Sequence, residues 1–270
     1  MADNCAPGKG DNISCFTKDQ LIYIGKVLNK EKKRKIINVK KSKKDIWEQI
    51  KKELFSECIY EWCWLDQKEL KNIKKRNELM NAFKPKMPKS WGKNKYEWLT
   101  TVDIYKVMKQ YEELYKNFIF FGPVPSDCPV EIYCELSNLN LEKLQKKKDY
   151  IGVVFNLDKH NEPGSHWVGL FVDIKKGYIF YYDSTAHPPP DSIFRFIKNI
   201  EDSLKKMKKK VVYKSNKHKH QFGGSECGIY SMNFIVEMLN GNKFEDIEKR
   251  KIPDNSMNVL RNYFFRPYNE

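Results

Sequence analysis

The sequence predicts an α+β fold, with helices at its start, a compact set of strands in its middle and a buried helix near its end. In the first third, apolar residues recur every three or four positions after helix-capping residues. Beyond residue 90, short apolar runs typical of strands replace this pattern. With 270 residues, 40% of them hydrophobic, the chain can bury a core as one large domain or as one domain with a smaller companion.

The first third of the chain is predicted to form three amphipathic helices. Thr17 with Gln20, and Ser42 with Asp45, match the capping-box pattern ahead of apolar residues at helical spacing. The run 66–83 (DQKELKNIKKRNELMNAF) shows the same spacing, so it is predicted to be the third helix.

Residues 84–91 (KPKMPKSW) are the best candidate for a linker, because they hold two prolines and three lysines. We therefore expect a helical accessory region over residues 1–90 and a second domain over residues 91–270. No apolar run approaches the ~18–20 residues that span a bilayer, and the first residues lack the apolar core of a signal peptide. We expect a soluble protein that does not contact membranes and is not secreted by the usual route.

The second region is predicted to alternate between helices and short strands. In chain order these are a helix over 100–115, strands over 150–157, 166–174 and 178–184, a helix over 191–209, a strand over 211–215 and a helix over 228–239. A short turn at 175–177 joins two of the strands into a hairpin.

The cysteines indicate neither a disulfide framework nor a metal site. The chain has an odd number of them: Cys5, Cys15, Cys58, Cys63, Cys128, Cys134 and Cys227. Their spacing fits no disulfide framework, so in a reducing compartment all would remain thiols. The closest pairs lack zinc-knuckle spacing and have no histidine nearby in the sequence, so we predict no metal and no cofactor.

Cys227 stands where a nucleophile could be held. It follows the flexible segment Gly223-Gly224-Ser225 and opens a helix, whose positive end stabilises an anion. A nucleophilic thiolate needs a base, and the base needs an orienting group. The alternative is a small apolar residue at the start of a buried helix.

His166 and Asp183 can supply the base and the orienting group. In a hairpin that turns at 175–177, the start of one strand lies beside the end of the other, so the two residues come close by register. Gln221, six residues before Cys227, could donate its amide N–H to an oxyanion, together with the Cys227 backbone. Read singly, these residues would be a strand-edge histidine, a turn aspartate and a solvated glutamine.

Together they resemble the adenovirus-protease and SUMO-protease clan of cysteine peptidases. His-Trp opens a strand, the aspartate follows seventeen residues later, and "GGSECGIY" resembles the family's Gly-x-Asp-Cys-Gly, with Glu226 in place of the aspartate. "GVVFNLDKHNEPGSHW" and "PDNSMNVLRNYFF" are most similar to the SUMO-protease-like thiol proteases of large cytoplasmic DNA viruses, of the African swine fever virus type. The resemblance covers about residues 91–270.

This resemblance implies a papain-like cysteine protease fold, with a central mixed sheet flanked by helices, behind a helical N-terminal extension. Cys227 would be the nucleophile, His166 the base oriented by Asp183, and Gln221 the oxyanion donor. Trp167 and Gly224 would contact substrate. In SUMO proteases the tryptophan at this position narrows a tunnel that only glycine passes. Cleavage after Gly-Gly or Gly-x is therefore implied, and core packing is the alternative role for Trp167.

Three functions remain open at this point. The first is processing of viral structural precursors during virion maturation, in the virion and the host cytoplasm. The second is removal of SUMO or ubiquitin-like modifiers from host conjugates. The third is an inert basic scaffold that binds nucleic acid.

The formal net charge of +15 lies largely in two lysine-rich stretches, 26–44 and 205–219. Solvated helix faces and loops are the simpler interpretation, and non-specific DNA contact is the alternative. Lysine predominates over arginine and few aromatics intervene, so base-specific recognition is not indicated. Because the second stretch lies just before Gln221 and Cys227 in the chain, DNA bound there is expected to order the catalytic loop.

Overall fold

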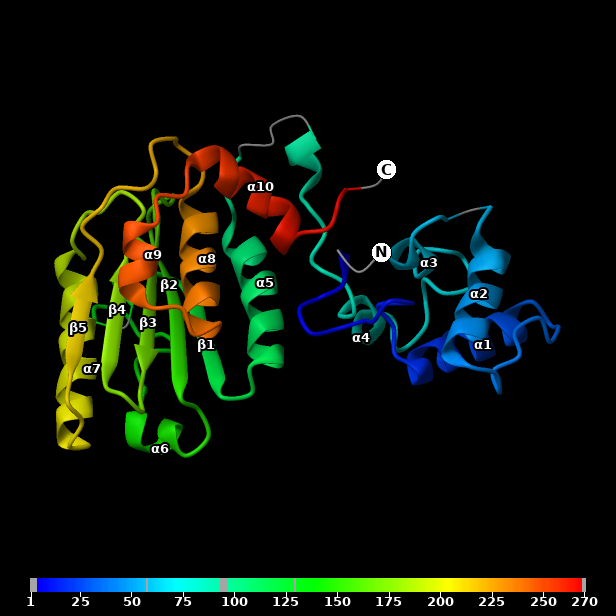
Figure 1. The fold of residues 1–270 in the computed structure, drawn as a ribbon, viewed down its shortest axis with the longest axis horizontal. Coiled ribbons are helices and arrows are strands. Elements are labelled where there is room, and N and C mark those ends of the chain that lie inside the picture. The colour runs from blue at the N-terminus through cyan, green and yellow to red at the C-terminus, as the bar shows by residue number, and fades with distance from the viewer. Residues whose placement is uncertain (1–3, 57, 93–96, 129, 269–270) are drawn as a thin grey trace. The chain divides into compact units, whose positions relative to one another are not determined.

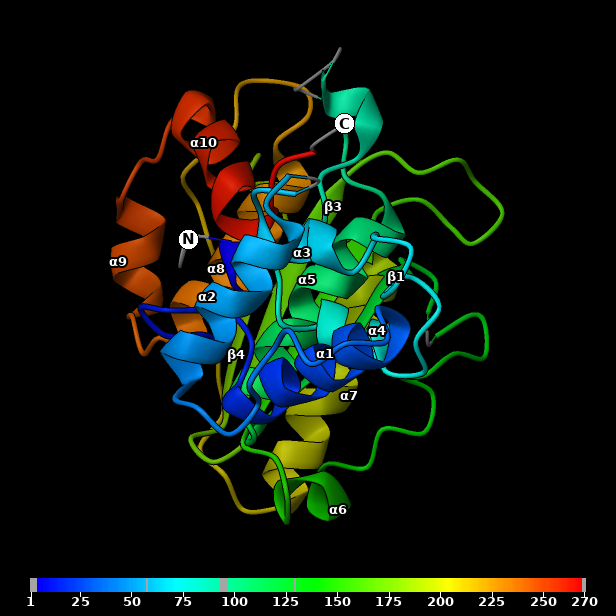
Figure 2. The same cartoon turned by 90° about the vertical axis from the view of Figure 1, so that its right-hand side faces the viewer.

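The computed structural model describes residues 4–56, 58–92, 97–128 and 130–268 (Figures 1 and 2). The chain divides into two compact units, one of residues 1–87 with 263–270 and one of residues 88–262. The sequence analysis assigned the last residues to the catalytic domain, and the division into domains 1–90 and 91–270 stays a prediction.

The first unit begins with the two helices that the capping boxes predict. These are α1 (Lys18–Glu31) and α2 (Lys43–Leu54), and both capping boxes are formed. Their apolar faces enter a core that also contains the fully buried Trp64 and Phe83. The charged residues of these helices are thereby left on the solvent side.

The third predicted helix, over 66–83, is wrong. The structure has two short helices instead, α3 (Glu61–Trp64) and α4 (Arg76–Met80). Between them the backbone forms successive turns, closed by bonds from the amides of Gln67, Leu70 and Ile73 to the carbonyls three positions earlier. Arg76 fixes this path, because its guanidinium donates to the Leu65 carbonyl at 3.1 Å and to the Asp66 carboxylate at 2.5 Å.

The second unit is built on a five-stranded mixed sheet in the order β1-β2-β3-β4-β5. The strands are β1 (Phe118–Pro125), β2 (Tyr150–Asn156), β3 (Trp167–Asp173), β4 (Tyr178–Tyr182) and β5 (Val212–Ser215). The two outer pairs are parallel and the two inner pairs antiparallel. The α+β prediction is confirmed.

Strand β1 was not predicted from the sequence. Its run FIFFGPVP contains a glycine and two prolines, which weaken any strand signal. The strand lies at the edge of the sheet, where proline is tolerated because only one side of the strand must donate hydrogen bonds.

Helices cover both faces of this sheet (Figures 1 and 2). One face packs against α7 (Asp191–Lys206) and α6 (Leu141–Gln145), whose apolar residues join those of the strands in one core. The other face carries α8 (Cys227–Leu239), α5 (Thr101–Leu114) and α9 (Phe244–Lys249). The 3₁₀ helix η2 (Lys89–Gly92) precedes α5, and α10 (Asp254–Phe264) follows α9.

Helix α8 is almost entirely buried and lies directly on β3. Two glycines allow this close approach. A Cβ at Gly169 would lie 2.9 Å from the Phe234 ring, and a Cβ at Gly152 would lie 3.1 Å from Ile235. Packing against the sheet therefore fixes the position of the helix that begins with Cys227.

The structure differs from the expectation that all seven cysteines are thiols. It joins Cys5 to Cys15, Cys58 to Cys63 and Cys128 to Cys134. Local turns bring the Cα atoms of these pairs to 5.2, 5.9 and 5.9 Å, within the range of a disulfide. Cys227 is free.

Within the described part of the chain, no helix has the length and apolar character needed to cross a membrane.

We predict that Gly169→Ala destabilises the protein by about 1–3 kcal/mol, because the added methyl overpacks the contact between β3 and α8. The Phe234 ring cannot easily yield, since it is buried and stacks on Tyr182 at 5.0 Å between centroids. Thermal unfolding measures the change. Gly224→Ala is the matched control, because a Cβ at that position meets nothing within 4 Å. Equal midpoints for both variants and the wild type would contradict the packing argument.

Candidate active site

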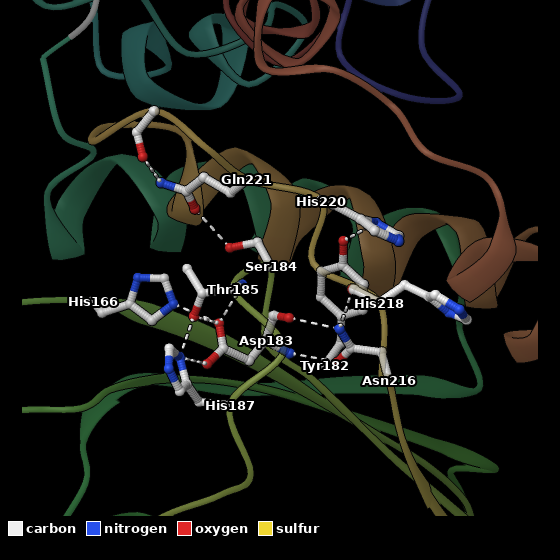
Figure 3. A network of polar contacts seen from close by, with 11 residues as sticks. His166, Tyr182, Asp183, Ser184, Thr185, His187, Asn216, His218, His220 and Gln221 are labelled. Carbon is white, nitrogen blue, oxygen red and sulfur yellow. Dashed lines mark hydrogen bonds and ion pairs between the residues drawn. The ribbon is translucent and has the colours of Figure 1, made fainter.

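His166 and Asp183 form the hydrogen-bonded pair that the hairpin register predicts (Figure 3). His166 directly precedes β3 and Asp183 directly follows β4, and the two strands pair antiparallel. The Nε2–H group of His166 donates to Oδ1 of Asp183 at 2.7 Å. The carboxylate is fully buried, so it depends on its protein partners for stabilisation.

Thr185 and Asn216 hold Asp183 in place (Figure 3). The backbone N–H and the hydroxyl of Thr185 both donate to Oδ1, each at 2.8 Å. The side chain of Asn216 bonds to the Asp183 backbone twice, accepting from its N–H at 2.9 Å and donating to its carbonyl at 2.6 Å. Oδ2 has no hydrogen bond within the described structure, and Nδ1 of His187 lies 3.9 Å from it.

The charges of this pair are strongly coupled. Burial lowers the pKa of His166, but hydrogen bonds to Asp183 and to Cys227 outweigh it and raise that pKa from 6.5 to about 9. For Asp183, burial favours the neutral acid, whereas the bond to His166 outweighs burial and holds the pKa of the carboxyl below its usual value. The site therefore favours an imidazolium beside a carboxylate at neutral pH.

Cys227 is the first residue of α8 and is buried. Because Nε2 of His166 is occupied by Asp183, Nδ1 is the ring atom left for the hydrogen bond with the Cys227 side chain. The unpaired N–H groups of the first helical turn add a favourable field for a negative sulfur. The structure thus brings together three of the four residues that the sequence assigns to catalysis.

A buried polar cluster behind Cys227 holds the start of α8, and the sequence did not reveal it. Glu226 accepts hydrogen bonds from the Ser225 hydroxyl at 2.9 Å and from the Asn258 amide at 2.8 Å. Arg261 donates to Asn258 at 2.9 Å and to the Ser225 carbonyl at 3.1 Å. Glu226 therefore orders the turn that carries Cys227, whereas Asn258 and Arg261 lie too far along the chain to be recognised from spacing.

Gln221 is anchored to the residue that follows Asp183 (Figure 3). Its Oε1 accepts from the Ser184 hydroxyl at 2.6 Å, and its backbone N–H donates to the Ser184 carbonyl at 2.9 Å. One N–H of its amide donates to the Gly223 carbonyl at 3.0 Å. A side-chain amide has two such donors, so the second is available to an oxyanion.

Trp167 is buried and is fixed through its ring nitrogen, which donates to the Leu99 carbonyl at 3.0 Å. Leu99 in turn packs on Gly228, where a Cβ would come within 2.9 Å of its side chain. The residues that precede α5 therefore pack beside both the tryptophan and the start of α8. Sequence analysis did not predict this role of Leu99.

Trp167 lines an open cavity of about 290 Å³ at the same end of the sheet. Other parts of the lining come from Val124 of β1, Asn156 of β2 and Gly164 of the loop before β3. Gly224 is exposed, and a Cβ there would meet open space, so packing does not require glycine at this position. The assignment of Trp167 and Gly224 to substrate binding stays a prediction.

The other histidines lie in loops, and one of them, His220, is buried and structural. Its Nδ1 accepts from the Tyr182 hydroxyl and its Nε2–H donates to the Glu248 carbonyl, each at 2.8 Å. Burial lowers the pKa of His220 and keeps it neutral. These bonds fix the segment that leads into Gln221.

Comparison with protein families places the second unit among proteases. Residues 126–270 match the model of the Ulp1 protease family, C-terminal catalytic domain. R355 of Acanthamoeba polyphaga mimivirus, a candidate thiol protease, is 36% identical over 284 residues, covering 97% of this chain and 93% of its own. The cysteine protease S273R of African swine fever virus is 28% identical over 135 residues, covering 49% of this chain and 50% of its own.

The crystal structure of the African swine fever virus pS273R protease has the same fold. It superposes with a TM-score of 0.71 at 20% sequence identity, covering 98% of this chain and 96% of that one. The predicted fold class, including its viral SUMO-protease-like type, is confirmed.

The raised pKa of His166 predicts that activity persists into alkaline solution. The imidazolium is stabilised below pH 6.5 and is lost as the pH rises through about 9, so kcat/KM should fall on its basic side near pH 9. Asp183→Asn should move this fall toward pH 6.5, because the amide carries no charge. Asp149→Asn is the control, since Asp149 bonds to Asn117 and Lys175 rather than to His166. If kcat/KM of the wild type already falls near pH 6.5, the proposed coupling between His166 and Asp183 is refuted.

Proposed function

The chain belongs to the Ulp1 protease family and is a cysteine protease, and on this premise we propose that it is an endopeptidase that cleaves after Gly-Gly or Gly-x sequences. The observation that carries the mechanism is the hydrogen-bonded pair of His166 and Asp183, with Cys227 on the free side of the imidazole.

The reaction proceeds in two stages. The Cys227 sulfur attacks the carbonyl carbon, and the Gln221 amide and a backbone N–H stabilise the oxyanion that forms. His166 gives its proton to the departing amine, which leaves an acyl-enzyme thioester. His166 then takes a proton from water, the hydroxide attacks the thioester, and the thiolate leaves with the imidazolium restored. Asp183 keeps the ring oriented and stabilises its positive charge throughout.

Trp167 supports the preference for glycine. Its ring is rigid, because both its nitrogen and its buried face are held by the protein. It stands next to His166 in the chain and lines the open cavity at the same end of the sheet, and in the proposed mode of binding the substrate passes this ring on its way to the base. A substrate without side chains next to the cleaved bond fits such a passage best.

We further propose that the substrates are viral structural precursors, cut in the virion and the host cytoplasm. Support comes from the viral origin of the relatives. Removal of a ubiquitin-like modifier is the second candidate, because some of those relatives are named SUMO-1 cysteine proteases. The third candidate, an inert nucleic-acid-binding scaffold, is wrong, because the chain is a cysteine protease and Cys227 is free.

A panel of Gly-Gly-x peptides, polypeptides with internal Gly-Gly-x sites and conjugates of SUMO and ubiquitin distinguishes these proposals. A precursor protease cuts the peptides and the internal sites, whereas a deconjugating enzyme cuts only the conjugates. Cleavage restricted to sites without glycine would refute the proposed specificity.

We expect Cys227→Ala and Cys227→Ser to abolish peptide cleavage while the thermal unfolding midpoint stays close to that of the wild type. The reason is that the thiolate forms the covalent intermediate. The matched control is the double variant Cys128→Ser/Cys134→Ser, which removes a disulfide in the same unit and should keep measurable turnover. If Cys227→Ala cleaves the peptide at the wild-type rate, Cys227 is not the nucleophile.

Gln221→Ala should lower kcat by about 10²-fold or more with little change in KM, because the oxyanion contact forms mainly in the transition state. Steady-state kinetics on one glycine-containing peptide measure both constants. Circular dichroism verifies that the loss is not one of folding. A rise in KM alone would place Gln221 in substrate binding instead.

A further inference from the structure

We propose that the end of the sheet opposite to the catalytic residues binds the phosphate backbone of double-stranded nucleic acid. Six exposed lysines define this surface, which we call the basic end: Lys116, Lys147, Lys175, Lys176, Lys208 and Lys210. They come from four segments that are far apart in the sequence. Only the last two belong to a stretch that the charge pattern of the sequence singled out.

The strand register brings these segments into one row. Phe118 of β1 pairs with Tyr150 of β2, Tyr150 with Asp173 of β3, Asp173 with Tyr178 of β4, and Tyr178 with Val212 of β5. Each lysine lies within five residues of one of these positions. Neighbouring strands are about 4.8 Å apart, so the row extends for about 19 Å across the sheet.

Contacts beyond the register hold the four segments together. The Val212 N–H donates to the Gly177 carbonyl at 2.9 Å, and a Cβ at Gly177 would lie 2.5 Å from the Lys210 carbonyl oxygen. The Lys148 ammonium donates to the Lys116 carbonyl at 3.0 Å, and the Ile174 N–H donates to the Asp149 carbonyl at 2.8 Å. The lysines are therefore presented by a rigid edge rather than by separate loops.

The charge at this edge is poorly compensated. Lys175 and Lys176 pair with Asp149 at 3.1 Å and with Asp173 at 3.9 Å. The other four, Lys116, Lys147, Lys208 and Lys210, form no ion pair with any carboxylate in the described structure. Like charges in one row repel one another, and a ligand with regularly spaced anions relieves that repulsion.

A nucleic acid duplex has the chemistry that fits. Its phosphates present about one charge per 1.7 Å of axis, and lysines that neutralise them release counterions. A lysine ammonium binds phosphate as a point charge, so a row of lysines suits the regularly spaced backbone phosphates rather than a particular base sequence. Of the exposed large apolar side chains of the described residues, only Leu114 lies within three residues of these lysines, so the surface offers little apolar area to insert into a membrane.

The basic end lies away from the catalytic residues. Asp183 follows the far end of β4, five residues beyond Tyr178 at the start of that strand, and a rise of about 3.3 Å per residue gives a separation of about 16 Å along the strand. Lys208 and Lys210 precede β5, whereas Gln221 follows its other end. Duplex bound at Lys208 and Lys210 would therefore lie away from the catalytic loop, and the expectation that DNA on the whole stretch 205–219 orders that loop stays a prediction. Bound nucleic acid would retain the protease and leave Cys227 open to substrate.

Binding of the full chain to a short mixed-sequence DNA duplex, measured by fluorescence anisotropy across a salt series, tests the proposal. The variant Lys116→Glu/Lys147→Glu/Lys208→Glu/Lys210→Glu should bind more weakly, and the slope of log K against log salt should fall in magnitude by about 4. The matched control, Lys26→Glu/Lys30→Glu/Lys35→Glu/Lys40→Glu, changes the net charge equally and should keep most of the affinity.

Peptide cleavage without DNA verifies that both variants are folded, because none of these lysines belongs to the catalytic machinery. Saturating duplex should leave the wild-type cleavage rate unchanged. Equal loss of binding in the two variants would overturn the proposal, since net charge alone would then explain it. It would also be overturned by a wild-type protein that binds phosphatidylserine vesicles but no duplex, or by a cleavage rate that changes when duplex is added.

Discussion

The active end of the second unit depends on one buried carboxylate. Asp183 has no exposed surface, and an ionised carboxylate in such a place is costly unless charged or polar groups surround it. His166 supplies the charged partner, and Thr185 and Asn216 supply neutral hydrogen bonds. The same contacts that stabilise the carboxylate also fix the orientation of the imidazole, so stability and catalysis share one set of bonds.

The rest of the site extends from this pair by short links. Ser184, next to Asp183, holds Gln221 at both its backbone and its side chain. The hairpin that joins His166 to Asp183 also includes Gly169, on which α8 is seated, and α8 begins with Cys227. The β3–β4 hairpin therefore positions the base, the oxyanion donor and the nucleophile, although 61 positions of sequence separate His166 from Cys227.

Local patterns were enough to predict much of this arrangement. The capping boxes before α1 and α2 and the turn between β3 and β4 act within a few residues, so their outcome follows from short spacing. Features that depend on distant contacts were missed. Strand β1 is defined by its pairing with β2, the turns after α3 by Arg76, and the clamp on Glu226 by Asn258 and Arg261. The three cysteine pairs likewise required the paths of turns that spacing does not reveal.

Direct observation of the His166 ring tests the central claim, that a buried Asp183 holds this imidazole in its charged form beside Cys227. Nitrogen-15 NMR of histidine-labelled protein reports the protonation of each ring nitrogen, and a His166→Gln variant assigns the signal. The account predicts that both ring nitrogens remain protonated until about pH 9, and that Asp183→Asn lowers this midpoint. A His166 ring that loses its proton near pH 6.5 in the wild type would contradict the account.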